Sequence, residues 1–337
     1  MKAWTITKHG GFDGLACVDR PDPKIGANDV LIKVQAVSLN YRDLITVQNE
    51  RPGNLPPPFV PCSDGSGEVV SVGSEVTRWK PGDRVAGIFF SDWVDGAFEL
   101  AYHRSALGGS APGMLSEFVV LHEKSLVAIP GYLSWEDAAC LPCAAVTAWQ
   151  ALFTRGGLIP GRTVLTLGTG GVSIFALQLA AAAGARVIVT SSSDEKLERA
   201  RVLGAWETVN YKTHPDWDKE VWRLTAKRGA DHVIELGGPG TLERSVACVA
   251  ASGQVALIGV LTGFGPATAN LFPLMARNAR IDGMYVGSRA DFEALNTFLS
   301  RYCIKPVIDR VFGFADARSA FTYMESGAHF GKVVIRV

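Results

Sequence analysis

Hydrophobic residues in the second half of the chain fall into short runs separated by longer segments of mixed polarity. Runs rich in valine, isoleucine and leucine are typical of strands buried on both faces, and their alternation with helical patterns is typical of a parallel sheet. We therefore expect an α/β fold with a doubly wound, six-stranded parallel sheet. The six expected strands are Thr163–Leu167, Arg186–Thr190, Glu207–Asn210, Asp231–Leu236, Gln254–Gly259 and Ile281–Val286.

The first part of the chain has a different pattern. Short apolar stretches alternate there with glycine and proline turns, which favours an antiparallel barrel. The proline-rich segment Arg51–Pro61 is expected to be a loop, and the segment Ser91–Gly113, rich in small residues, a mobile lobe. Helices are expected at Ser134–Ala139 and Val146–Phe153 before the parallel sheet, and at Asp291–Tyr302 and Ala315–Ser326 after it, followed by a last strand at Lys332–Val337.

A glycine-rich turn joins the first expected strand of the sheet to the helix that follows it. It reads Gly168-Thr169-Gly170-Gly171-Val172, and the alanine- and leucine-rich stretch after it has no helix breaker until Gly184. Such a turn lets a helix N-terminus approach a pyrophosphate without side chains in the way. The sixth position of the dinucleotide fingerprint is Ser173 in place of glycine. The strand–turn–helix context predicts a dinucleotide site; the alternative is a glycine-rich loop in another kind of α/β protein.

The end of the second expected strand indicates which dinucleotide binds. It reads Val189-Thr190-Ser191-Ser192-Ser193 and lacks the acid that would accept hydrogen bonds from an adenine-ribose 2′-hydroxyl. The hydroxyls of Ser191 and Ser192 tolerate a 2′-phosphate, and Lys196 lies within reach to neutralise it. We therefore predict NADP(H). Two alternatives remain open: the serines could cap the next helix with Lys196 in solvent, and Asp194 or Glu195 could turn toward the ribose.

Composition narrows the function classes. The 337 residues suffice for two domains, and 33 basic residues balance 33 acidic ones. No stretch concentrates lysine and arginine, and the longest apolar run is too short for a bilayer, which argues against nucleic-acid and membrane partners. Met1 leads directly into strand-like sequence, without the pattern of a signal peptide. The six scattered cysteines fit free thiols, so a cytoplasmic location is expected.

Several short motifs occur in an order that resembles the medium-chain dehydrogenase/reductase superfamily, in its zinc-independent branch of quinone oxidoreductases, zeta-crystallin and enoyl reductases. The motifs are Ser38–Asp43, Gly65–Val69, Pro81–Val85, Leu141–Ala148 and Gly168–Val172. The resemblance covers nearly the whole chain. It implies a GroES-like β-barrel catalytic domain built from residues 1–127 and 289–337, with a Rossmann NADP-binding domain inserted at residues 128–288. It also implies a homodimer in which the strand Ile281–Val286 joins two subunits into one sheet, which would cover an aggregation-prone edge.

Zinc-dependent members of this superfamily hold their catalytic metal with a cysteine, a histidine–glutamate pair and a second cysteine. The matching positions here are Asn40, Ser63-Asp64 and Cys143. Asparagine and serine are poor zinc ligands, and Asp64 and Cys143 are too few for a catalytic site that uses three protein ligands. The expected lobe contains no cysteine for a structural zinc site either. We therefore predict that no metal takes part.

The resemblance also implies the site residues. It makes Tyr41 the proton donor or oxyanion partner, with Asn40 and Arg42 beside it in the cleft between the two domains. The implied cofactor contacts are Asn40, Thr147, Gly168, Thr169, Gly170, Gly171, Val172, Ser191, Ser192, Lys196, Tyr211, Gly237, Gly259 and Lys332. Alternatively, Tyr41 packs against the protein, Asn40 binds only the cofactor ribose and Arg42 pairs with Asp43. Phe89, Phe90 and Trp93 would line the substrate cleft or pack in the core.

These residue types favour one kind of chemistry. A nicotinamide delivers hydride to an electrophilic carbon when the developing oxyanion is stabilised and a proton is supplied. A quinone, or an alkene conjugated to a carbonyl, spreads that charge itself and needs less Lewis acid. The favoured function is therefore the NADPH-dependent, zinc-independent reduction of a quinone, enone or enoyl substrate. The alternatives are a zinc-independent NADP-dependent alcohol dehydrogenase or carbonyl reductase, and an NADPH-binding protein with a structural or regulatory role.

Overall fold

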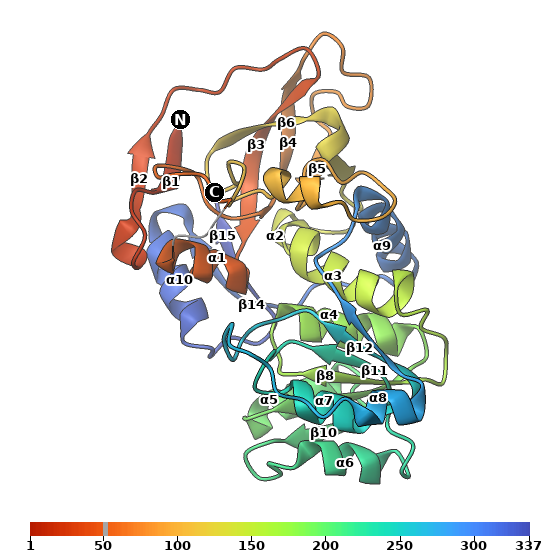
Figure 1. Ribbon diagram of the computed structural model, residues 1–337. Coiled ribbons are helices and arrows are strands. Elements are labelled where there is room, and N and C mark those ends of the chain that lie inside the picture. The colour runs from red at the N-terminus through yellow and green to blue at the C-terminus, as the bar shows by residue number, and fades with distance from the viewer. Residues whose placement is uncertain (50–52) are drawn as a thin grey trace. The chain divides into compact units, whose positions relative to one another are not determined.

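The computed structural model of the chain describes residues 1–49 and 53–337 (Figure 1). By its internal contacts this part of the chain divides into two compact units. Unit 1 comprises Met1–Val146 and Val286–Val337, and unit 2 comprises Thr147–Tyr285.

The sheet of unit 2 has six strands, all parallel, in the order β10-β9-β8-β11-β12-β13. The strands are β8 (Thr163–Leu167), β9 (Arg186–Ser191), β10 (Glu207–Asn210), β11 (Ala230–Glu235), β12 (Val249–Leu257) and β13 (Arg280–Gly283). Every residue of β8 and β11 is buried. The polar side chains of β11, Asp231, His232 and Glu235, are hydrogen-bonded there. The predicted doubly wound parallel sheet is confirmed, and its chain order reverses between β8 and β11.

Helices cover both faces of this sheet (Figure 1). They are α4 (Gly171–Ala182), α5 (Asp194–Val202), α6 (Trp217–Leu224), α7 (Leu242–Cys248) and α8 (Phe272–Arg277). The helix α4 packs on β8 and β9 and stops before Gly184, whose φ of +79° is the left-handed conformation that glycine adopts without strain. The helices α6 and α7 pack against each other, and their buried side chains join those of the strands in one apolar core.

Two strand boundaries differ from the predicted ones by more than two residues. The strand β12 begins at Val249, before the predicted start at Gln254, and β13 ends at Gly283, before the predicted end at Val286. Val286 has a φ of +60°, in the left-handed region that β-branched residues rarely adopt, so an extended strand cannot continue through it. The predicted strand Ile281–Val286 is therefore wrong at its C-terminal end.

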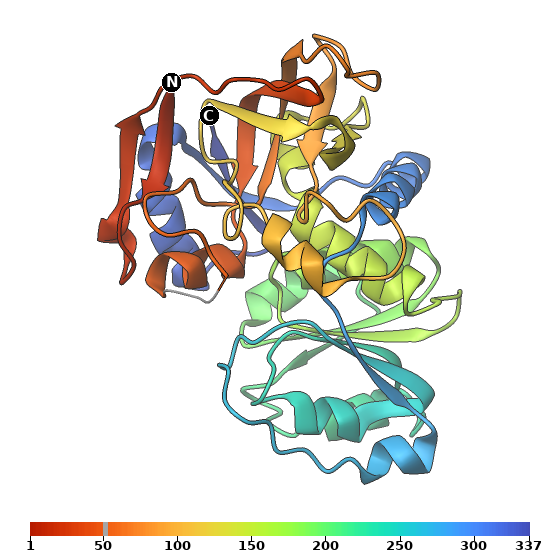
Figure 2. The same cartoon turned by 45° about the horizontal axis from the view of Figure 1, so that its top comes forward.

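Unit 1 is built on a mostly antiparallel sheet in the order β14-β15-β3-β4-β5-β7, with β6 also paired to β3. Only the β14–β15 pair within it is parallel. The strands are β3 (Asp29–Ser38), β4 (Asp64–Val72), β5 (Arg84–Gly87), β6 (Phe118–His122), β7 (Leu126–Ala128), β14 (Ile308–Gly313) and β15 (Lys332–Arg336), and a separate pair is formed by β1 (Lys2–Ile6) and β2 (Leu15–Asp19). Both chain ends lie in this unit (Figure 2), because β15 returns to pair with β3.

The helices of unit 1 begin in different ways, three of them with a reciprocal capping pair. They are α1 (Tyr41–Gln48), α2 (Trp135–Ala139), α9 (Arg289–Tyr302) and α10 (Ala317–Glu325), and α3 (Val146–Trp149) runs on into unit 2. Ser134 caps α2 in a reciprocal pair with Asp137, as its sequence predicts. Asn40 and Asp43 form the same kind of pair at the start of α1. This second pair sets the start of α1, whose first two residues are Tyr41 and Arg42.

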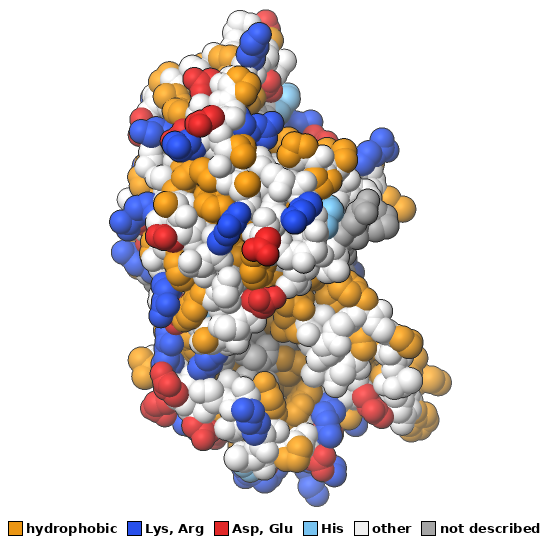
Figure 3. All heavy atoms as spheres, turned by 90° about the vertical axis from the view of Figure 1, so that its left-hand side faces the viewer, with side chains coloured by type: hydrophobic (Ala, Val, Ile, Leu, Met, Phe, Trp, Pro, Cys, Tyr) orange, Lys and Arg blue, Asp and Glu red, His pale blue; other side chains and the backbone are white. Residues whose placement is uncertain are grey.

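The connecting segments and the surface complete the description. Short turns of 3₁₀ or π type occupy Phe12–Gly14, Leu100–Ser105, Glu123–Ser125, Leu141–Ala145, Gln150–Thr154 and Phe314–Asp316. Of the predicted loop Arg51–Pro61, the first two residues lie outside the described ranges. No helix among the described residues is both long and apolar enough to cross a membrane. On the face shown in Figure 3, basic and acidic side chains are interspersed.

Candidate functional site

The glycine turn of unit 2 leaves an open space in front of the N-terminus of α4. Gly170 is the residue before the helix, with φ −78° and ψ −175°, and no side chain caps the helix there. A Cβ added at Gly168 or Gly170 would meet no atom of the described residues within 4 Å beyond its chain neighbours. The N–H groups of the first helical turn, which starts at Gly171 and Val172, therefore face a cradle free of side chains. This arrangement fits a diphosphate.

Ser173 takes the place of the third glycine of the dinucleotide fingerprint. Its side chain is buried, and Oγ donates a hydrogen bond of 2.7 Å to the carbonyl oxygen of Leu167. This bond ties the first turn of α4 to the last residue of β8. In the fingerprint, glycine at this position lets the helix pack closely on the strand. Here a hydrogen bond from the Ser173 hydroxyl joins the helix to the strand instead.

The carboxyl ends of β9 and β10 bring together the residues predicted to meet a 2′-phosphate. Asn210 pairs with Ser191, and the N–H of Tyr211 donates to the carbonyl oxygen of Ser191 at 3.0 Å. Ser193 caps α5 by accepting a hydrogen bond from the N–H of Lys196. Of the three serines, Ser193 therefore caps the next helix, as the alternative interpretation proposed. Ser191, Ser192, Lys196 and Tyr211 all surround the end of one strand.

A buried carboxylate at the end of β11 was not singled out by the sequence. Glu235 is fully buried and accepts hydrogen bonds from the N–H groups of Gly237 and Gly238, at 2.7 and 2.9 Å, and from the hydroxyl of Thr241 at 2.5 Å. The hydroxyl of Ser245 donates to its other oxygen. These bonds hold the turn after β11 at the carboxyl edge of the sheet. The available signal was an acid at the end of a strand, two residues before a pair of glycines.

Two of the predicted cofactor glycines are required by the protein's own packing. A Cβ at Gly237 would lie 2.2 Å from the hydroxyl oxygen of Thr241, and a Cβ at Gly259 would lie 2.2 Å from the carbonyl oxygen of Leu236. Gly259 lets the chain after β12 approach the end of β11, and Gly237 leaves room for the Thr241 side chain in the turn after β11. A cofactor contact at either backbone stays a prediction.

In unit 1, a buried polar cluster surrounds the end of β3. The Nζ of Lys332 donates to the Leu39 carbonyl oxygen at 2.7 Å and to Asn40 Oδ1 at 2.6 Å. Asp64 accepts from the N–H of Cys143 at 3.0 Å and from the Ser63 hydroxyl at 2.7 Å. Lys332, at the start of β15, and Asn40, just after β3, are far apart in sequence and are joined by the pairing of these strands.

Burial sets the protonation of this cluster. It raises the pKa of the Asp43 carboxyl to about 6, against the opposing charge of Arg42. It also raises the pKa of the Asp64 carboxyl, against the Lys332 ammonium. Burial and the charge of Asp64 together raise the pKa of the Cys143 thiol. The thiol is therefore held in its neutral form, which is a weak metal ligand.

These residues do not suit a catalytic zinc ion. Of the four residues that match the metal ligands, one is Asn40, whose amide oxygen accepts a hydrogen bond from an ammonium group. Zinc prefers thiolate, imidazole and carboxylate ligands, and a fixed positive charge beside them opposes the binding of a second cation. The described residues contain no group of three or more histidine, cysteine or acidic side chains that could hold a metal ion. Metal-free chemistry stays a prediction.

The predicted catalytic residues differ in their surroundings. Tyr41 is the first residue of α1 and is 39% exposed, and among the described residues its side chain has no hydrogen-bond partner. Arg42 donates to the Leu107 carbonyl oxygen at 2.8 Å, lies 3.6 Å from Asp43 Oδ1 and packs its guanidinium on the Phe89 ring. The phenol of Tyr41 is thus open to a ligand, whereas Arg42 is held within its unit.

Other predicted residues are buried in the protein. Thr147 lies in α3 and is buried, as is Thr169 in the glycine turn. Phe89, Phe90 and Trp93 are almost completely buried, and Phe90 and Trp93 pack with Phe98 in an aromatic cluster of the Ser91–Gly113 segment. The core-packing alternative therefore describes these three aromatic side chains.

Known proteins share this architecture. Two family models match the chain: an alcohol dehydrogenase GroES-like domain at residues 26–131 and a zinc-binding dehydrogenase at residues 171–301. A zinc-type alcohol dehydrogenase-like protein of Schizosaccharomyces pombe is 45% identical over 97% of this chain and 96% of its own. A quinone oxidoreductase of Pseudomonas aeruginosa is 32% identical over 97% of this chain and 97% of its own. The crystal structure of an NAD-dependent alcohol dehydrogenase matches with a TM-score of 0.90 and 35% identity over 100% of both chains.

The matches cover both units, and the parallel sheet and the GroES-like sheet occur in the chain order that the sequence predicts. The chain therefore belongs to the medium-chain dehydrogenase/reductase superfamily, in the branch that includes quinone oxidoreductases and enoyl reductases.

Proposed function

We propose that the protein is a zinc-independent oxidoreductase that uses NADPH to reduce a quinone, enone or enoyl substrate. The observation that carries this proposal is the open cradle at Gly168 and Gly170. It lies at the carboxyl end of β8, where the strand order of the sheet reverses. Dinucleotides bind at such a reversal point in open α/β sheets, with the diphosphate at the helix N-terminus. The relatives, an alcohol dehydrogenase-like protein and a quinone oxidoreductase, support the broader class of oxidoreductase.

The choice of NADPH over NADH rests on the end of β9. Ser191 stands at the end of this strand, where NAD enzymes carry an acid. Ser192, Lys196 and Tyr211 offer two hydroxyls and an ammonium group to a 2′-phosphate. A fluorescence titration with each nucleotide tests this choice, and equal affinity for NADH and NADPH would refute it.

When bound, the nicotinamide supplies a hydride to an electrophilic carbon. The chain's own residues then have to stabilise the developing oxyanion and supply a proton. We propose the exposed phenol of Tyr41 for the proton, and the amide of Asn40, oriented by Lys332, for hydrogen bonding to cofactor or substrate. Arg42 lies 3.6 Å from Asp43, whose carboxylate accepts the Asn40 N–H at 2.8 Å, so we propose that Arg42 helps to position Asn40.

The decisive assay follows NADPH consumption with quinones, enones, enoyl thioesters and aldehydes. Consumption with a quinone or an activated alkene, and none with simple alcohols in the reverse direction, is the expected outcome. NADP-linked oxidation of alcohols would favour an alcohol dehydrogenase instead, as the name of the Schizosaccharomyces pombe relative suggests. Tight NADPH binding without turnover of any substrate would favour a structural or regulatory role.

We also propose a homodimer in the cytoplasm. The strand β13 is an edge of the parallel sheet, and large apolar side chains in the segment before it are more than half exposed: Leu261, Phe264, Leu271, Phe272 and Met275. A second copy that extends the sheet would cover this edge and these side chains. Light scattering should give the mass of two chains, and the mass of one chain would overturn the proposal. No disulfide joins the six cysteines, all of which lie in the described ranges.

A further inference from the structure

The end of β10 contacts the start of α5 through one side-chain pair. Asn210 Nδ2 donates a hydrogen bond of 2.7 Å to Asp194 Oδ1. Asp194 is the first residue of α5, and Asn210 is the last residue of β10. The register that pairs Asn210 with Ser191 brings this contact beside the residues proposed to receive a 2′-phosphate.

The amide of Asn210 is fixed in its orientation. Its Oδ1 accepts a hydrogen bond of 3.0 Å from the N–H of Lys212. A backbone N–H can only donate, so the amide oxygen has to face Lys212 and the amide NH₂ has to face Asp194. The carbonyl oxygen of Asn210 also accepts from the N–H of His214 at 2.8 Å and from the Thr213 hydroxyl at 3.1 Å. The donor that faces Asp194 is therefore held by a well-bonded turn.

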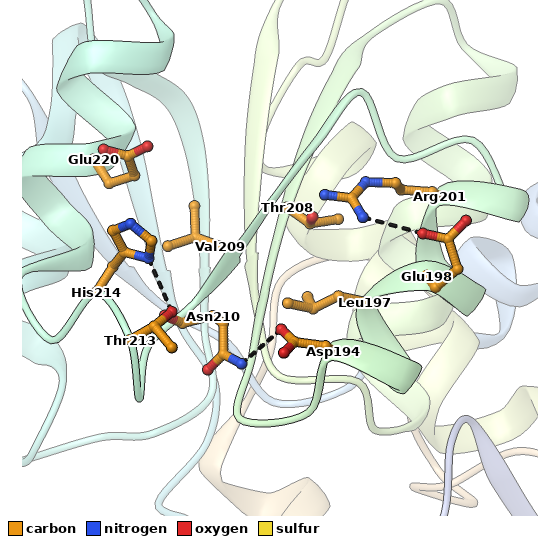
Figure 4. Close-up of a pocket in the computed structure, with 10 residues that line it drawn as sticks. All are labelled: Asp194, Leu197, Glu198, Arg201, Thr208, Val209, Asn210, Thr213, His214 and Glu220. Carbon is orange, nitrogen blue, oxygen red and sulfur yellow. Dashed lines mark hydrogen bonds and ion pairs between the residues drawn. The ribbon is translucent and has the colours of Figure 1, made fainter.

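This contact decides which way the carboxylate of Asp194 points. Asp194 and Asn210 turn toward each other at the rim of a hollow of about 470 Å³ between α5 and β10 (Figure 4). The other lining residues include Leu197, Glu198 and Thr208. The hydrogen bond thus draws the carboxylate toward β10, and Asp194 is one of the two acids that could otherwise turn toward the adenine ribose.

A free carboxylate at this place would change the nucleotide preference. It would accept hydrogen bonds from the ribose hydroxyls of NADH, and it would repel the 2′-phosphate of NADPH. We propose that Asn210 is a specificity-determining residue: it holds the Asp194 carboxylate away from the ribose and so favours NADPH. This inference rests on the proposed function, because it concerns the same nucleotide site.

The test measures the dissociation constants of NADPH and NADH for the full-length protein and its variants. Asn210→Ala removes the donor and frees Asp194, and it should lower the preference for NADPH about tenfold, which corresponds to about 1.4 kcal/mol. Asn210→Asp keeps an acceptor for the Lys212 N–H but repels Asp194, so it should shift the preference in the same direction. Adding Asp194→Asn to Asn210→Ala should restore the preference, since the carboxylate that Asn210 held is then absent.

Glu198→Ala is the matched control. Glu198 lines the same hollow but bonds to Arg201 within α5, so its removal should leave the preference unchanged. If the wild type prefers NADPH and both Asn210 variants keep that preference, the inference is overturned and the proposed function stands. If the wild type binds both nucleotides equally or prefers NADH, the inference and the proposed NADPH dependence are both overturned.

Discussion

Replacement of Gly170 by aspartate should separate nucleotide binding from folding. Gly170 is the N-cap of α4, with φ −78° and ψ −175°, a conformation that any residue adopts without strain. An added Cβ meets no atom of the described residues within 4 Å beyond its chain neighbours. Aspartate is a favoured N-cap residue, so Gly170→Asp would supply the side-chain cap that the helix lacks.

The two expected effects have opposite signs. A capping aspartate gains a few tenths of a kcal/mol over glycine, and its charge at the helix N-terminus adds about 0.3–1 kcal/mol, so the free energy of unfolding should stay the same or rise slightly. Its carboxylate would occupy the cradle proposed for the diphosphate. Two charges about 4 Å apart repel by about 1 kcal/mol in bulk water and about 4 kcal/mol near a protein surface, so the NADPH dissociation constant should rise between about fivefold and several hundredfold.

Urea denaturation and a fluorescence titration with NADPH measure the two quantities. Gly170→Asn is the matched variant, because it caps the helix without the charge and should weaken NADPH binding less than aspartate does. Gly131→Asp is the control for position, since an added Cβ there also meets no described atom within 4 Å. If Gly170→Asp binds NADPH as tightly as the wild type, the diphosphate does not lie at this helix end and the reasoning fails.

Three further substitutions test other residues of the candidate site. Tyr41→Phe should lower kcat about tenfold or more while the NADPH dissociation constant changes less than about threefold, and an unchanged kcat would remove the phenol from the mechanism. Glu235→Ala leaves two buried N–H groups without an acceptor, so it should lower the free energy of unfolding by about 2–6 kcal/mol. Glu235→Gln keeps one oxygen for them and should cost about 1 kcal/mol. Equal losses for the two variants in urea denaturation would contradict this expectation. The folded Asp43 carboxyl keeps its proton up to about pH 6, and an unfolded one loses it near 3.8, so the folded state binds more protons in that window. The wild type should therefore lose stability relative to Asp43→Asn as the pH rises from about 4 to 6, and a parallel pH dependence of the two proteins would count against the buried carboxyl.

The sequence predicted those features that depend only on neighbouring residues, such as buried strands and the glycine turn. A strand buried on both faces is usually rich in apolar residues, so β8 and β9 were recognisable within one residue of their observed ends. The glycine turn was recognisable because the phosphate cradle needs the absence of side chains at fixed spacing. The end of β13 was missed, since the left-handed conformation of Val286 has no signature in an apolar run.

Tertiary structure alone decided which distant residues share a buried environment. Lys332 forms a hydrogen bond with Asn40 because β15 pairs with β3, and no sequence pattern near either residue predicts that contact. The same holds for Glu235, whose four hydrogen bonds form only when the turn after β11 folds back on the start of α7. A sequence states what a short segment prefers, whereas the orientation of an amide or the protonation of a buried carboxyl depends on neighbours that the fold brings together.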